Sequence, residues 1–144
     1  MRVLVQRSGL SRVFCDGKIT GKIDNGFVLF VGFTEGDDIN SINYMINKVL
    51  HLRIFPDEDN IMNKNILDFG GDILSISQFT LYGDARKSNR PSYIRALNRE
   101  DAVILFNRFN EELSKYIKVE TGSFGNDMDV FIENIGPTTI LLER

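Results

Sequence analysis

A chain of 144 residues is long enough to form one domain with a core of its own. Its content of 42% hydrophobic and 26% charged residues is that of a globular protein and excludes a disordered or fibrous one. The net charge of -3 disfavours general binding to a nucleic-acid backbone, and we expect no binding to DNA, although contact with only the end of an RNA remains compatible with it.

The first part of the chain predicts strands. One strand is expected at residues 3–6. The dipeptides Asp16-Gly17 and Asn25-Gly26 then mark two tight turns, because these residues tolerate positive φ angles. The two turns predict an antiparallel meander that ends with residues 27–31. That last run is apolar without interruption, which indicates a strand covered on both faces.

Two amphipathic helices are expected next. Asp37 or Asp38 can cap the first, whose apolar residues recur at helical spacing over residues 42–50. Asn98 can cap the second, which continues to residue 113. The remaining strands are predicted at residues 72–79, 117–120, 130–133 and 138–142, with loops at 56–60 and 87–93. This order favours an α/β or layered α+β fold, a single domain over residues 1–144 with an antiparallel-rich, barrel-like sheet and two main helices.

The common catalytic side chains are scarce. His51 is the only histidine and lies in a helical pattern, so a histidine-based metal site is excluded. Cys15 is the only cysteine, which excludes an intrachain disulfide and indicates a small buried side chain. The acidic residues 57–60 lack the glycine and the final glutamate of a calcium loop. We therefore expect no metal and no cofactor.

The sequence also predicts a cytoplasmic protein. The apolar run at the N-terminus is too short for a signal peptide, and no stretch approaches the roughly 20 apolar residues of a membrane span.

Two short motifs stand at the ends of predicted strands. Residues 77–81 read Ser-Gln-Phe-Thr-Leu, and residues 134–139 read Asn-Ile-Gly-Pro-Thr-Thr. Small hydroxyl and amide side chains beside a glycine-proline pair indicate a pocket built largely from backbone. Packing at the strand ends is the alternative interpretation.

A basic segment lies between the two motifs. Its positive residues are Arg86, Lys87, Arg90, Arg95 and Arg99, and its one acidic residue is Asp84. Such a segment can hold phosphates, and the flanking residues Tyr82 and Tyr93 can stack on a base. A solvated loop is the alternative interpretation.

Together these motifs resemble those of the D-aminoacyl-tRNA deacylase family. Both family signatures are intact, Ser-Gln-Phe-Thr-Leu at residues 77–81 and Asn-x-Gly-Pro-x-Thr at residues 134–139. Further matching segments, Gln6-Arg7, Arg90-Pro91-Ser92 and Phe124-Gly125 among them, follow in the family's order along the whole chain.

The resemblance implies a homodimeric hydrolase that cleaves the ester between a D-amino acid and the 3′ end of tRNA. In the family, a cis Gly-Pro pair of one subunit reaches into the active site of the other, which identifies Gly136 and Pro137 as the residues that reject L-amino acids. Arg7, Asn134 and Thr139 are expected to support that segment. Glycine has no side chain to collide with it, so glycyl-tRNA, including tRNA-Ala mischarged with glycine, is expected to be a substrate too.

The resemblance also implies how the reaction proceeds. Backbone N–H groups at Phe79 and Thr80 would stabilise the oxyanion, and Ser77 and Gln78 would shape the substrate site. The 2′-hydroxyl of the substrate would help to activate the water. The terminal adenosine would be the part of the RNA that is recognised, and phosphates of the acceptor stem would be contacted at Arg86, Lys87 and Arg90.

Three other interpretations stay open from the sequence. A non-catalytic module that binds an RNA end or a nucleotide would keep the pocket and the basic segment. A broad esterase would use Ser77 or Thr80 as a nucleophile. A purely structural dimer would need neither motif for chemistry.

Overall fold

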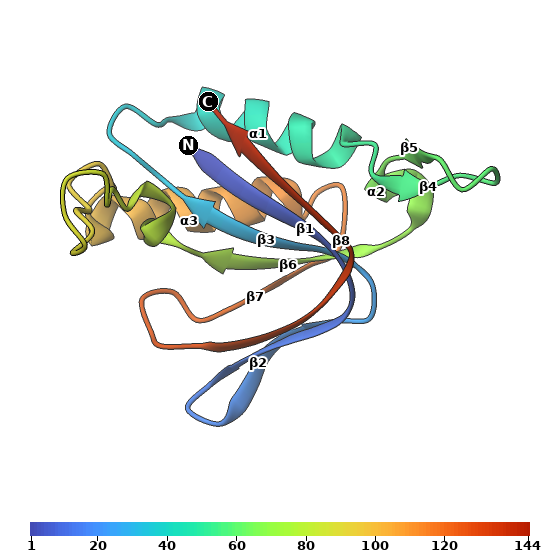
Figure 1. Ribbon diagram of the computed structural model, residues 1–144, viewed down its shortest axis with the longest axis horizontal. Coiled ribbons are helices and arrows are strands. Elements are labelled where there is room, and N and C mark those ends of the chain that lie inside the picture. The colour runs from blue at the N-terminus through green and yellow to red at the C-terminus, as the bar shows by residue number, and fades with distance from the viewer.

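The computed structural model describes residues 1–144, and its sheet is organised around β1 (Arg2–Cys15). The first half of β1 pairs with β3 (Gly26–Gly32), its second half pairs with β2 (Lys18–Ile23), and β8 (Asp129–Glu143) follows its other edge, all antiparallel. β6 (Asp72–Ser77) joins β3 in parallel, and β7 (Val119–Thr121) joins β6 in parallel. Because β2 also lies against β6 and β7, the sheet curls into a nearly closed barrel (Figure 1).

Helices cover one side of this sheet. The two long ones, α1 (Ile39–His51) and α3 (Arg99–Leu113), contact each other as well as the sheet. The short elements are α2 (Ile66–Phe69), the 3₁₀ helix η1 (Phe79–Tyr82) and a small hairpin of β4 (Phe55–Pro56) and β5 (Met62–Lys64). All of them form a single domain, in agreement with the layered, barrel-like fold predicted from the sequence.

The strand predicted to be covered on both faces is β3. Phe27 and Leu29 point into the larger core cluster, which α1 and α3 complete, whereas Val28 belongs to a second cluster inside the barrel with residues such as Leu74. Two-sided burial explains why this run shows no alternation of polar and apolar residues.

Both predicted helix caps are confirmed. The Asp38 carboxylate accepts a hydrogen bond from the N–H of Ser41 at 3.0 Å, and Asn98 caps α3 in the same way. Asp37, the other candidate, instead pairs with the ammonium group of Met1 at 2.7 Å and ties the N-terminus to the start of α1.

The predicted meander is only half right. The Asp16-Gly17 turn does join two paired strands, but β3 pairs with β1 and not with β2, so Asn25-Gly26 is no hairpin turn. The reason is the length of β1: its 14 residues provide one edge on which two later strands can pair in succession.

The C-terminal strands also differ from the prediction. The two strands expected at 130–133 and 138–142 are one strand, β8, and the glycine-proline pair lies inside it. Opposite Arg7 the register shifts, because Gln6 pairs with Thr139 and Ser8 with Asn134. Residues 135–138 therefore form a bulge in β8 that faces a single residue of β1.

No helix in the structure combines the length and the apolar character that crossing a membrane requires.

The packing of α3 against the larger core cluster predicts how substitutions on this helix change stability. Phe109 of α3 is fully buried in the larger core cluster, whereas Ile104 of the same helix is 64% exposed. Phe109→Ala should lower the free energy of unfolding by about 3–5 kcal/mol, measured by chemical denaturation. Ile104→Ala, the matched control, should change it by less than about 0.5 kcal/mol; equal effects would contradict the core described here.

Candidate active site

The first motif is placed by the end of the parallel pairing between β3 and β6. The last pair of this ladder is Val31 with Ser77, and the N–H of Gln78 then donates to the Val31 carbonyl at 2.7 Å before the chain turns into η1. Gly32 makes this close approach possible, since a Cβ atom there would lie 2.9 Å from the Gln78 carbonyl oxygen. The strand predicted to reach residue 79 thus ends at Ser77, and the motif itself forms the turn.

The turn leaves backbone donors free at its start. The first N–H groups of a helix, here those of Phe79 and Thr80, have no partner within the helix. The Gln78 side chain does not cap them; its amide nitrogen donates to the Thr80 hydroxyl instead. The geometry therefore offers two adjacent backbone N–H groups for an incoming oxygen.

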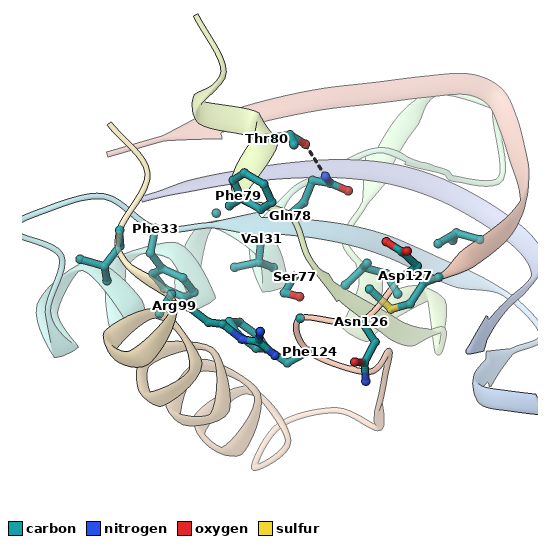
Figure 2. A pocket seen from close by; sticks show the side chains of 17 residues that line it. Val31, Phe33, Ser77, Gln78, Phe79, Thr80, Arg99, Phe124, Asn126 and Asp127 are labelled. Atoms are coloured by element: carbon teal, nitrogen blue, oxygen red, sulfur yellow. Dashed lines mark hydrogen bonds between the residues drawn. The ribbon is translucent and has the colours of Figure 1, made fainter. Parts of the chain in front are cut away.

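These residues line a cavity of about 610 Å³. Figure 2 shows Gln78 and Phe79 on one side of it and Phe124 and Asn126 on the other. The lining between them includes apolar side chains such as Val31 and Ile76. A concave, mostly apolar site with a few polar groups is the usual form of a small-molecule pocket.

The second wall of the cavity was not predicted from the sequence. It consists of residues 124–128 and the start of α3, where Arg99 lies against Gly125 so closely that a Cβ atom on the glycine would be 2.6 Å from the guanidinium. Gly125 also has a φ of +74°, a conformation that favours glycine. The glycines at 122 and 125 were the available signal for this wall.

No hydrogen-bonded acid–base pair lines the cavity that contains the Ser77 and Thr80 hydroxyl groups. Its only charged lining residues are Arg99 and Asp127. His51 is exposed on α1, 2.9 Å from the Asn47 carbonyl, and does not line the cavity. No hydrogen bond joins the hydroxyl of Ser77 or Thr80 to a carboxylate or an imidazole, and the Thr80 hydroxyl accepts one from the Gln78 amide instead, so neither hydroxyl is activated as a nucleophile would be.

The second motif forms the exposed bulge of β8. The peptide bond between Gly136 and Pro137 is cis, as the family resemblance implied, and Gly136 has a φ of +112°. Arg7 holds the bulge from β1: its Nε donates to the Ile135 carbonyl at 3.3 Å, and its Nη1 donates to the Ile54 carbonyl at 2.7 Å.

Asn134 and Thr139 close the base of the bulge. The Thr139 hydroxyl donates to the Pro137 carbonyl at 3.1 Å. The Asn134 amide, oriented with its nitrogen toward carbonyl oxygens, donates to Arg7 at 3.1 Å and to Thr138 at 3.2 Å, and its oxygen accepts from Gln6. Side chains at both ends of the bulge thus hold its backbone in place.

The structure does not bring the two motifs together within one chain. Gly136 and Pro137 are exposed and do not line the cavity beside Thr80.

The basic segment is exposed, as predicted, but only part of it is free. The Arg86 side chain donates two hydrogen bonds to Asp84, at 2.9 and 2.6 Å, and its backbone N–H donates a third at 3.0 Å; together they hold the pKa of that carboxyl well below its usual range. Lys87 and Arg90 lie in the exposed loop.

Tyr82 cannot stack on a base. It is only 4% exposed, and burial, together with the charge of Asp37, raises the pKa of its hydroxyl to about 12. Tyr93 is 40% exposed and packs edge-on against Phe79, with the ring centroids 5.1 Å apart.

Comparison with known proteins identifies the family. Residues 4–143 match the family described as D-Tyr-tRNA(Tyr) deacylase. The chain belongs to this family. That result confirms the resemblance drawn from the two motifs.

Relatives are similar over the whole chain. A protein of Clostridium botulinum (strain Langeland) named D-aminoacyl-tRNA deacylase is 51% identical, and the alignment covers 99% of this chain and 97% of the relative. A protein of the same name from Anoxybacillus flavithermus is 49% identical, with 99% of each covered.

Solved structures show the same fold. The "c-Myc DNA Unwinding Element Binding Protein" superposes with a TM-score of 0.95 at 34% identity and covers 100% of this chain and 99% of its own. A structure titled as a probable eukaryotic D-amino acid tRNA deacylase has a TM-score of 0.83 at 17% identity, covering 98% and 97% of the two chains.

Proposed function

We propose that the cavity beside η1 is where this enzyme, a D-aminoacyl-tRNA deacylase, hydrolyses the ester of D-aminoacyl-tRNA. The observation that carries the assignment of the site is the pair of free backbone N–H groups at Phe79 and Thr80 on the wall of a 610 Å³ cavity. The cavity has room for a terminal adenosine and an aminoacyl group, and its apolar lining suits the faces of a purine.

In the proposed reaction, water attacks the ester carbonyl, whose oxygen becomes negatively charged. The N–H groups of Phe79 and Thr80 donate to that oxygen, the bond to the ribose oxygen breaks, and a free D-amino acid and the tRNA hydroxyl are released. Because no hydrogen-bonded acid–base pair lines the cavity, the 2′-hydroxyl of the substrate helps to position and activate the water. Ser77 and Gln78 shape the site, and Gln78 orients the Thr80 hydroxyl.

We further propose that a second copy of the chain completes the site as a homodimer. The bulge of Gly136 and Pro137 is held at its base by Arg7, yet both residues are exposed, so it is a rigid feature that projects from its own chain. Large apolar side chains on the same strand are also exposed, namely Phe131, Ile135, Ile140 and Leu141. An apolar surface of this kind is typical of an interface between subunits.

The bulge would supply the rejection of L-amino acids. A D- and an L-aminoacyl ester carry the same groups, so attraction alone separates them poorly, and a fixed obstacle on one side of the substrate separates them well. Backbone held at both ends by Arg7 and Thr139 cannot rotate away as a side chain would. Glycyl-tRNA, with no side chain on either side, would be hydrolysed too.

The RNA beyond the terminal nucleotide would be contacted at the basic segment, with Lys87 and Arg90 available for phosphates and Arg86 partly engaged by Asp84. We propose a cytoplasmic location, because aminoacyl-tRNA is used there. The solved structure named for DNA binding does not lead us to propose a DNA partner, since this chain has a net charge of -3.

The alternatives are less well supported. A non-catalytic nucleotide-binding module does not agree with membership of a hydrolase family. A serine or threonine esterase would need a base hydrogen-bonded to Ser77 or Thr80, whereas the only side chain that bonds to either hydroxyl is the Gln78 amide, at Thr80.

Paired substrates test this function. The enzyme should hydrolyse D-tyrosyl-tRNA at least about 100-fold faster than L-tyrosyl-tRNA, because a wall that collides with one isomer costs that isomer several kcal/mol in its barrier. The release of tyrosine is followed under identical conditions for both. Equal rates would contradict the rejection of L-amino acids by the bulge. Failure to hydrolyse either substrate would contradict the deacylase function.

A backbone substitution tests the oxyanion site. Proline is tolerated at the first residue of a helix and has no N–H, so Phe79→Pro should lower kcat by about 100- to 1,000-fold. Phe79→Ala, the matched control, removes the same ring but keeps the N–H and should retain most of kcat. Similar losses in both variants would mean that the ring, and not the backbone donor, is what matters.

A further inference from the structure

A second, smaller hollow of about 260 Å³ lies at the other end of η1. Phe79 and Thr80 at the start of η1 line the catalytic cavity, whereas Tyr82 at its end lines this hollow. Three arginines from distant parts of the sequence meet there, namely Arg2 of β1 and Arg86 and Arg95 of the segment before α3.

Two of these guanidinium groups lie close to the same aromatic ring. The guanidinium carbon of Arg2 is 4.7 Å from the centroid of Tyr82, and that of Arg95 is 5.9 Å from it. Arg2 is also fixed in orientation, because its Nη1 donates to the Leu81 carbonyl at 2.7 Å. Like charges gathered at one ring repel each other, so the arrangement favours the entry of an anion.

The carboxylates nearby leave one positive charge unpaired. Glu143 pairs with Arg2 at 2.6 Å, and Asp84 pairs with Arg86 at 2.6 Å. Arg95 has no ion-pair partner, although its backbone is held in place by the Thr34 hydroxyl, which donates to its carbonyl at 2.6 Å. Planar guanidinium groups arranged around a small hollow are well suited to the oxygens of a phosphate.

An exposed aromatic pair connects this hollow with the catalytic cavity. Phe79, 56% exposed, lines the cavity and packs against Tyr93. Tyr93 in turn lies beside Gly83 of the hollow, so closely that a Cβ atom on the glycine would be 3.0 Å from its ring. Aromatic rings next to positive charges are the features by which proteins bind single-stranded nucleic acid.

We propose that this hollow binds a backbone phosphate of the single-stranded 3′ end of the tRNA, with Arg95 and Arg2 as the binding residues and Phe79 and Tyr93 beneath the RNA between the two sites. The inference rests on the proposed function, because the ester of the same RNA occupies the catalytic cavity. It assigns the contact to a preformed site next to η1, in addition to the proposed contacts of Lys87 and Arg90 in the exposed loop.

Arg95→Gln tests the phosphate site with two substrates that differ in their phosphates. D-tyrosyl-tRNA carries backbone phosphates and D-tyrosyl-adenosine carries none. The variant should raise KM for D-tyrosyl-tRNA about tenfold with kcat unchanged, and should lower the slope of log KM against log salt concentration by about 0.7, the value for one phosphate of a single strand. Its kinetics with D-tyrosyl-adenosine should equal those of the wild type.

Two further variants serve as controls. Arg108→Gln removes the same charge from the exposed surface of α3, where Arg108 pairs with Glu112, and should leave KM for both substrates unchanged. Arg95→Lys keeps the charge and should retain most of the salt dependence. Thermal melting should be the same for all variants, since Arg95 is exposed.

The outcomes separate the two proposals. An Arg95→Gln enzyme with unchanged KM for D-tyrosyl-tRNA, or with equal losses on both substrates, would overturn the phosphate site and leave the deacylase function intact. A wild-type enzyme that hydrolyses neither substrate would overturn the proposed function and this inference with it.

Discussion

The hydrogen bonds of Arg7 are the interaction on which the rest of the site depends. One guanidinium joins the carbonyl of Ile54 to that of Ile135, and so it fixes the bulge of β8 to the long strand β1. A bulge that was free to move would present no defined surface to a substrate. Held in place, the backbone of Gly136 and Pro137 becomes a rigid projection on an exposed part of the chain.

In the cavity, too, the proposed functional groups belong to the backbone and not to side chains. The groups that we propose bind the oxyanion are the N–H groups at the start of a 3₁₀ helix, placed by the hydrogen bond from Gln78 to Val31 and by the absence of a side chain at Gly32. Backbone groups are preorganised by the fold and need no pKa adjustment, which agrees with the proposed reaction, in which the substrate helps to activate the water. The two proposed functional parts of the site are the N–H groups of η1 from one copy and the bulge of β8 from the other. Both are parts of the main chain.

Much of this could be predicted from the sequence, for identifiable reasons. Caps such as Asp38 and Asn98 act locally, so their roles can be predicted from neighbouring residues. Each of the two motifs is an uninterrupted run of residues, so the sequence alone shows both motifs and their resemblance to the family. The predictions that were wrong concern pairing between strands that lie far apart in the sequence. β3 pairs with β1 instead of its neighbour β2. β8 continues through Gly136 and Pro137 because β1 pairs with it on both sides of the bulge.

The parts of the site that escaped prediction share that cause. Phe124 and Arg99 line the same cavity as the first motif only because the fold brings the segment after β7 and the start of α3 to that cavity, which no spacing in the sequence reveals. Tyr82, predicted as a stacking residue from its position beside the basic segment, is buried, and its neighbour Tyr93 is the exposed ring. Periodicity could not distinguish the two, because Tyr82 ends a 3₁₀ helix of only four residues and Tyr93 lies in a loop.

Mixing of two inactive variants tests the shared site most directly. Phe79→Pro damages the cavity, and Gly136→Ala damages the bulge, since a Cβ atom there would lie 2.6 Å from the Thr138 hydroxyl. Each variant alone should be nearly inactive on D-tyrosyl-tRNA, because the first lacks the backbone donor and the second displaces the bulge that completes the site of the other copy. Co-expressed in equal amounts, they should recover about a quarter of wild-type activity, because about half of the dimers are mixed and each mixed dimer holds one intact site. A mixture no more active than its parents would contradict a site built from two copies.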